Sequence, residues 1–160
     1  LVKKQIRVVT NAGGLNPKAC RTKIFEVARE LGVSGFKVGV VEGDDLLGRL
    51  PDLLGRGHEL RNMDSGAPLA PRLSQVTSAN AYIGARPVAE ALDGGALIVL
   101  CGRVTDTALA LGPLVHEFGW AADDWDRLAA DIVREMAALA DGMTMSAKKD
   151  GSTHKVALAA

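Results

Sequence analysis

Hydrophobic and polar positions repeat with two different periods along the first third of the chain. Residues 5–10, QIRVVT, are short and rich in β-branched side chains, which predicts a strand. Residues 17–31 carry an apolar stripe at helical spacing, preceded by Asn16 as a good N-cap and begun by Pro17. The stripe consists of Cys20, Ile24, Val27, Ala28 and Leu31. With a second strand predicted at residues 36–41, this is a βαβ unit, whose strands run parallel.

The rest of the chain continues the alternation of strands and helices. Residues 96–101, ALIVLC, are apolar on both alternating faces, which predicts a central strand covered on both sides. We predict another strand at residues 73–78 and helices over residues 87–93 and 106–118. A final long helix is predicted from Asp123 to the stop at Gly142, with Trp125 in its buried stripe. The pattern predicts an α/β, Rossmann-like three-layer domain with a mostly parallel sheet.

Two segments lie outside this pattern. Residues 55–72 contain Gly, Pro, Asn, Asp and Ser without periodicity, as in long excursions over a site or an interface. Residues 143–160 are small and polar with a basic patch. We therefore predict one α/β ligand-binding domain over residues 1–142, followed by a poorly ordered tail over residues 143–160.

Composition narrows the classes of function. Lys plus Arg and Asp plus Glu number 19 each, without a basic run, so we expect no nucleic-acid partner. Apolar runs are too short to cross a bilayer, and the chain start is not a secretory leader, so we expect a cytoplasmic protein without a membrane partner. Cys20 and Cys101 lack the spacing of a metal site or a disulfide framework. We expect two free thiols and no metal.

Polar residues follow each predicted strand. In a parallel α/β sheet the ligand sits beyond the carboxyl ends of the strands, so these residues mark one candidate site. They are Asn11, Gly13, Gly14 and Asn16 after the first strand, Glu42, Asp44 and Asp45 after the second, Ser78 and Asn80 after the third, and Arg103 and Asp106 after the fourth.

The loop NAGGLNP, residues 11–17, is the first candidate for binding an anion. Gly13 and Gly14 let the backbone approach a ligand closely, and the N-terminus of the following helix favours a phosphate or a carboxylate. Alternatively, the two glycines only form a tight turn and Asn16 only caps the helix. The loop lacks the spacing G-x-G-x-x-G, so it is weak support for a dinucleotide.

Arg103 is the second candidate, because an arginine at the end of a core strand can bind a carboxylate or phosphate with two hydrogen bonds. The alternative is an ion pair between Arg103 and Asp106. Asp44 and Asp45 also have a structural alternative, as helix caps in solvent. His116 follows the apolar face of its predicted helix by one position, so we interpret it as a surface residue rather than a catalytic base.

Four strings of the sequence together resemble one protein family. They are VVTNAGGLNPKAC, VVEGDDLL, SANAYIGARPVAEALDGGA and GRVTDTALALGPLVHEFGWAADDWDRLA. They resemble the N-terminal domain of the acyclic terpene utilisation family AtuA, over roughly residues 3–130. The resemblance implies a role in bacterial breakdown of acyclic terpenes, a route with CoA thioester intermediates. It does not name a reaction, and we expect the chain to be an incomplete member of the family.

These observations lead to one main hypothesis for function. We expect an α/β domain that binds an anionic small molecule, such as an acyl-CoA intermediate, at the carboxyl ends of its strands. The expected ligand-binding residues are Asn11, Gly13, Gly14, Asn16 and Asn80. The candidate catalytic residues are Asp44, Asp106 and Arg103.

Two alternatives stay open, and the residues assign no cofactor. One is a nicotinamide-dependent oxidoreductase with a degenerate nucleotide loop. The other is a non-catalytic partner of a pathway enzyme, with residues 55–72 and the region of Trp120 and Trp125 as its contact surface. A homo-oligomer is a further partner to consider.

Overall fold

The computed structural model describes residues 1–121, 123–124, 126, 128–129, 145–149 and 152–156. Most of the helix predicted over residues 123–142, including Trp125, lies outside the described residues. A hairpin of β4 (Met145–Lys149) and antiparallel β5 (Ser152–Val156) lies in the segment for which we predicted a tail. The proposed domain boundary at residue 142 stays a prediction.

A three-stranded parallel sheet forms the centre of the fold. A short 3-10 helix, η1 (Val2–Lys4), leads into β1 (Val8–Thr10), which is followed along the chain by β2 (Val38–Val41) and β3 (Ile98–Cys101). Their spatial order is β1-β3-β2, and β3 pairs in parallel with both neighbours. The predicted α/β fold with a parallel sheet is confirmed, and the strand predicted at residues 96–101 is its central member.

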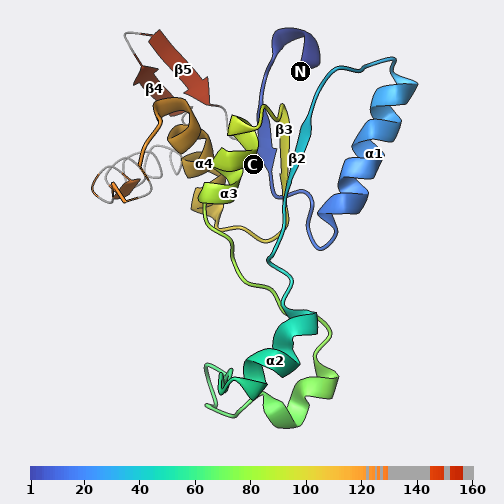
Figure 1. Ribbon diagram of the computed structural model, residues 1–160, viewed down its shortest axis with the longest axis vertical. Helices are drawn as coiled ribbons and strands as arrows, with labels where there is room; N and C mark the ends of the chain where they lie inside the picture. Colours follow the sequence, from blue (N-terminus) through green and yellow to red (C-terminus); the bar gives the residue numbers. More distant parts are fainter. Residues whose placement is uncertain (122, 125, 127, 130–144, 150–151, 157–160) are drawn as a thin grey trace.

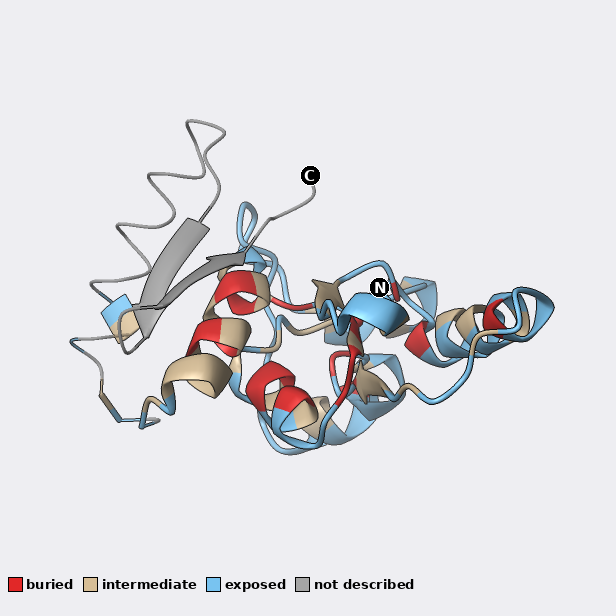
Figure 2. Cartoon of the chain, turned by 90° about the horizontal axis from the view of Figure 1, so that it is seen from above, coloured by how far each residue is buried: buried red, intermediate tan, exposed pale blue. Residues whose placement is uncertain are grey.

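Helices cover both faces of this sheet. Helix α1 (Pro17–Glu30) lies on one face, and α3 (Arg86–Asp93) and α4 (Asp106–Phe118) lie on the other (Figure 1). The buried residues gather in β3, α3 and α4 (Figure 2). Helix α1 covers its face less completely: Ala28 is buried, whereas Val27 and Leu31 of the predicted stripe are exposed. None of the described helices is both long enough and apolar enough to span a bilayer.

Helices α3 and α4 pack against each other at very short range. Gly112 allows this approach, because a Cβ at this position would lie 2.5 Å from Val88 Cγ1 and 3.2 Å from the carbonyl oxygen of Ala85. Val88 is fully buried. Pro113 follows directly, and α4 nevertheless runs as one helix from Asp106 to Phe118. The small residue therefore sets the distance between the two helices.

Residues 46–78 form a separate lobe beyond the carboxyl ends of the strands (Figure 1). The lobe contains η2 (Leu47–Arg49), α2 (Leu50–Gly55) and η3 (Ala70–Gln75). The strand predicted at residues 73–78 is wrong, because η3 occupies residues 73–75 and no strand is formed over residues 76–78. Its half-buried Leu73 and Val76 are three residues apart, which suits the period of a 3-10 helix. Leu50 is the one buried residue of the lobe.

Two adjacent backbone segments, residues 44–46 and 79–81, connect the lobe to the sheet, and we call them the neck. Leu46 N–H donates to Ala79 O, and Ala81 N–H donates to Asp44 O, both at 2.8 Å. Asp45 and Asn80 face each other as an antiparallel bridge. The lobe is therefore joined to the body through a short two-stranded ribbon.

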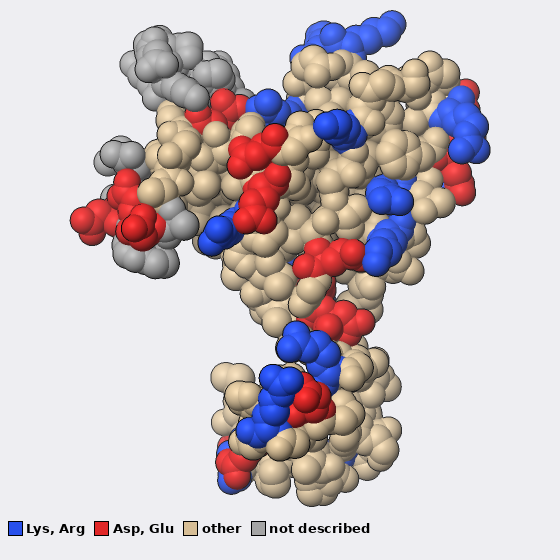
Figure 3. Space-filling view, viewed as in Figure 1, with Lys and Arg blue, Asp and Glu red and all other residues tan. Residues whose placement is uncertain are grey.

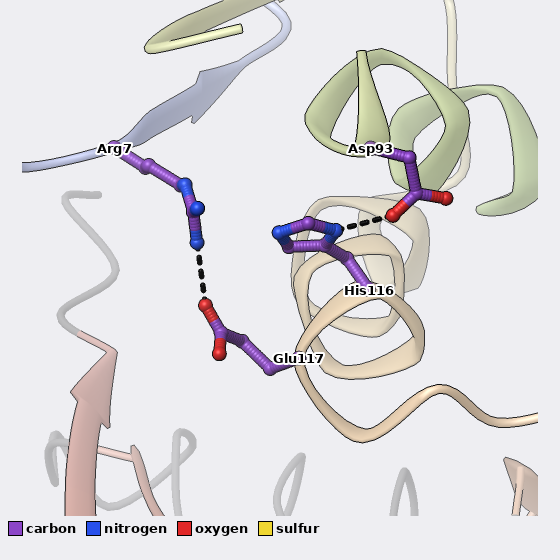
Figure 4. A network of polar contacts seen from close by, with 4 residues as sticks. All are labelled: Arg7, Asp93, His116 and Glu117. Atoms are coloured by element: carbon purple, nitrogen blue, oxygen red, sulfur yellow. Dashed lines mark hydrogen bonds and ion pairs between the residues drawn. The ribbon is translucent and has the colours of Figure 1, made fainter. Parts of the chain in front are cut away.

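Polar contacts tie the opposite end of the sheet together (Figure 4). Arg7, just before β1, donates to Glu117 at 2.5 Å, and His116 Nδ1 lies 2.5 Å from Asp93 Oδ1 at the end of α3. The side chain of His116 is only 16% exposed. His116 is less exposed than we predicted for a surface residue, and it links the last turns of α3 and α4.

The close packing at Gly112 predicts that Gly112→Ala destabilises the protein. Alanine favours a helix by about 1 kcal/mol over glycine, but the new methyl group would overlap Val88, and such overpacking costs about 1–3 kcal/mol. Val88 is β-branched and buried, so it has little freedom to move away. We expect a lower free energy of unfolding in urea denaturation.

Gly55→Ala is the matched control. Gly55 ends α2, and a Cβ at this position would meet no atom within 4 Å. We expect its variant to be as stable as the wild type or up to about 1 kcal/mol more stable, because alanine favours a helix over glycine and meets no clash here. Equal stability of the Gly112→Ala and Gly55→Ala variants would contradict the packing argument.

Candidate functional site

The carboxylate of Asp44 is the centre of the polar cluster at the carboxyl ends of the strands. Asp44 follows β2 and is buried, with 6% of its surface exposed. Its Oδ2 accepts hydrogen bonds from Asn80 Nδ2 and from the backbone N–H of Arg103, both at 3.0 Å. A Cβ at Gly102 would lie 2.5 Å from Asp44 Oδ1, so the carboxylate fits only beside a glycine. Asp44 thus joins the loop after β2, the neck and the loop after β3.

Arg103 has a fixed backbone and an exposed side chain. Its N–H donates to Asp44, and its carbonyl accepts from Ile83 N–H at 3.1 Å. Its guanidinium makes no ion pair with any residue that the structure describes. The pairing with Asp106 that we considered as an alternative is not formed. Among the described residues the arrangement presents an unpaired cation on a backbone held by two hydrogen bonds.

The loop after β1 packs its glycine against the end of β3. Gly13 is buried, and a Cβ there would lie 2.6 Å from Cys101 O. Gly14 has a φ of 54°, in the left-handed region that favours glycine. Its N–H donates to Asn11 O. The predicted tight turn is therefore formed, and it rests on the central strand two residues before Arg103.

The same loop satisfies part of its own hydrogen-bonding capacity. Asn16 Oδ1 accepts from Ala19 N–H at 3.0 Å, which confirms Asn16 as the cap of α1. Within the described residues, three backbone N–H groups between Gly13 and Lys18 have no acceptor. They belong to Gly13, Leu15 and Lys18. A helix N-terminus with free N–H groups favours an anion, so the loop keeps some of the predicted capacity.

An ion pair between α1 and the end of β2 was not predicted from the sequence. Lys18 Nζ lies 3.1 Å from Glu42 Oε2, and both side chains are largely exposed. Acidic and basic side chains also meet where the lobe joins the body (Figure 3). Lys18 stands one position after the proline of NAGGLNP, so its place in the first turn of the helix predicted over residues 17–31 was the only sequence signal for this ion pair.

The other predicted site residues are placed at the same edge, in different surroundings. Asp106 is exposed in the first turn of α4, three residues after Arg103. Asp45 Oδ1 accepts from Leu47 N–H at 2.9 Å, in a local turn just before η2, whose N-cap residue is Leu46. Asp44, Asn80 and the backbone N–H of Arg103 therefore form one connected cluster, and Gly13 packs against the carbonyl of Cys101. Asn11 and Asp106 are exposed.

The thiol of Cys101 lies at the end of β3 in the hydrophobic core, and it is not arranged as a nucleophile. Cys101 is fully buried, and burial raises the pKa of its thiol to about 11. The reactive form of cysteine is the thiolate, so the thiol is inert near neutral pH. In the part of the chain that the structure describes, no three His, Cys, Asp or Glu side chains group as they would around a metal ion.

Comparison with known proteins gave one match. The family model described as "Acyclic terpene utilisation family protein AtuA" matches residues 1–134. No curated protein and no solved structure matches the chain. The match covers β1, β2, β3 and the whole polar cluster.

The burial of Cys101 predicts that the two cysteines differ in reactivity. At pH 7.5, iodoacetamide should modify the partly exposed Cys20 in the folded protein and leave Cys101 unmodified. When the protein is unfolded in urea, Cys101 should be modified as well. Mass spectrometry of the alkylated peptides measures both, and equal modification of the two thiols in the folded protein would contradict this assignment.

The raised pKa of Cys101 also predicts a loss of stability at alkaline pH. Its ordinary value is 9.0, and the folded value is about 11. Between these values the unfolded chain releases the proton first, so unfolding becomes more favourable as the pH rises. In urea denaturation series at pH 8.5 to 11, Cys101→Ala should show a shallower decline of stability than the wild type. Cys20→Ala should keep the decline of the wild type.

Proposed function

The chain belongs to the acyclic terpene utilisation AtuA family, and we propose that it binds an anionic small molecule in the breakdown of acyclic terpenes or branched-chain acids. The class of ligand we propose is an acyl-CoA thioester. The binding site is the edge of the sheet formed by the carboxyl ends of β1, β2 and β3. A domain that acts in the cytoplasm suits this role.

The observation that supports this proposal most is the arrangement of Arg103. Its backbone is bonded on both sides while its guanidinium carries no carboxylate partner among the described residues. An unpaired arginine on a rigid loop binds phosphate or carboxylate with little loss of conformational entropy. This is the chemistry that the phosphates of coenzyme A or a free carboxylate require.

The neighbouring loops supply the remaining roles in the proposal. The free N–H groups of Gly13, Leu15 and Lys18 favour the same anion, and Asn11 and Gly14 form the exposed wall of that loop. Asp106 is the exposed carboxylate beside Arg103 and is the residue we propose for proton transfer or for orienting a polar group of the ligand.

The test of the proposal is calorimetric titration with coenzyme A, acetyl-CoA and isovaleryl-CoA. We expect isovaleryl-CoA to bind the wild type and Arg103→Ala to bind it more weakly by roughly tenfold to a hundredfold, as expected when a hydrogen bond to a charged group is lost. No heat with any of the three compounds would overturn the proposal.

Arg29→Ala is the matched control. Arg29 is an exposed arginine at the far end of α1, and its variant should bind isovaleryl-CoA as the wild type does. A titration with NADH, followed by its fluorescence, separates the oxidoreductase alternative. Tight binding of NADH together with no binding of isovaleryl-CoA would favour that alternative.

A further inference from the structure

The carboxylate of Asp44 is built as a support for other residues. A carboxylate that takes part in proton transfer needs access to its reacting partner, and Asp44 has 6% of its surface exposed. Both of its described hydrogen bonds are accepted by one atom, Oδ2, from protein donors. Its other oxygen faces the α-carbon of Gly102. The carboxylate of Asp44 is therefore occupied by contacts with protein groups.

The donors on Asp44 belong to two regions that are distant in the sequence. Asn80 lies 36 residues away in the neck, and Arg103 lies 59 residues away after β3. The backbone of Asp44 also belongs to the neck, since its carbonyl accepts from Ala81 N–H. One buried side chain therefore links the attachment of the lobe to the peptide group that carries the free guanidinium.

We propose that Asp44 is a positioning residue: its carboxylate fixes the backbone of Arg103 and joins it to the neck, so that the guanidinium is held for an anion. This inference rests on the proposed function of Arg103. It replaces the catalytic role that we assigned to Asp44 from the sequence. A hydrogen bond from a backbone N–H to a carboxylate is stronger than one to a neutral acceptor, which suits a fixed support.

The first test is hydrogen exchange without any ligand. In Asp44→Ala the N–H of Arg103 loses its acceptor, so exchange in residues 102–105 should become roughly tenfold faster or more. Asp44→Asn keeps one carbonyl oxygen that can occupy the place of Oδ2 and accept from both donors, so its exchange should stay within about threefold of the wild type. Unchanged exchange in Asp44→Ala would overturn the proposal.

Asp45→Ala is the matched control for the neck. Asp45 is the neighbouring carboxylate, and it accepts from Leu47 N–H without a bond to the loop after β3. Its variant should exchange like the wild type in residues 102–105. Faster exchange there in Asp45→Ala would show that any disturbance of the neck loosens Arg103, and would count against a specific role of Asp44.

The second test uses isovaleryl-CoA and a double-mutant cycle. If Asp44 acts through Arg103, Asp44→Ala should weaken binding, and the double variant Asp44→Ala/Arg103→Ala should bind no more weakly than Arg103→Ala alone. Losses that add in full would show that Asp44 acts independently and would overturn the proposal. Failure of the wild type to bind isovaleryl-CoA would reject the proposed function, while hydrogen exchange would still decide the role of Asp44.

Asn80→Ala keeps the proposal testable where Asp44→Ala does not fold. This variant removes one donor from Oδ2 and leaves the bond to Arg103 N–H. Exchange should rise in residues 79–82 and stay unchanged in residues 102–105. Exchange that rises tenfold or more in residues 102–105 of this variant would place the support of Arg103 in the neck and not in its bond to Asp44, and would overturn the proposal.

Discussion

The parallel pairing of β3 with both of its neighbours is the constraint on which the rest of the structure depends. Because β1 and β2 flank β3 and point the same way, three loops that are distant in sequence end at one edge. Val99, Leu100 and Cys101 of β3 are buried, so apolar contacts on both of its faces hold this strand between the two helical layers. Every residue of the candidate site is positioned by this central strand.

At that edge, glycines let neighbouring loops approach each other closely. Gly13 rests on the carbonyl of Cys101, and Gly102 leaves room for the carboxylate of Asp44. On the helical layer, Gly112 plays the same part for α3 and α4. Close backbone contacts and one buried carboxylate thus hold the loops of the site together. The exposed side chains of Arg103 and Asp106 take no part in those contacts.

Local sequence patterns predicted the features that depend on contacts between residues close in the sequence. The apolar run of residues 96–101 identified β3, and Asn16 was correctly assigned as the cap of α1. The strand predicted at residues 73–78 failed because Leu73 and Val76, three residues apart, fit the period of a 3-10 helix and not the alternation of a strand. The burial of Asp44 could not be predicted, because its donors lie 36 and 59 residues away and nothing in GDD distinguishes Asp44 from Asp45. Long-range contacts, not propensities, separated the two carboxylates.

The neck has a consequence for how this fold can vary. Leu46 and Ala79 are hydrogen-bonded across the ribbon, so the chain departs and re-enters at adjoining points. The entropy of closing such an excursion changes only slowly with the number of residues in it. The lobe is therefore an insertion in the topological sense, and its length can change without displacing any strand of the sheet.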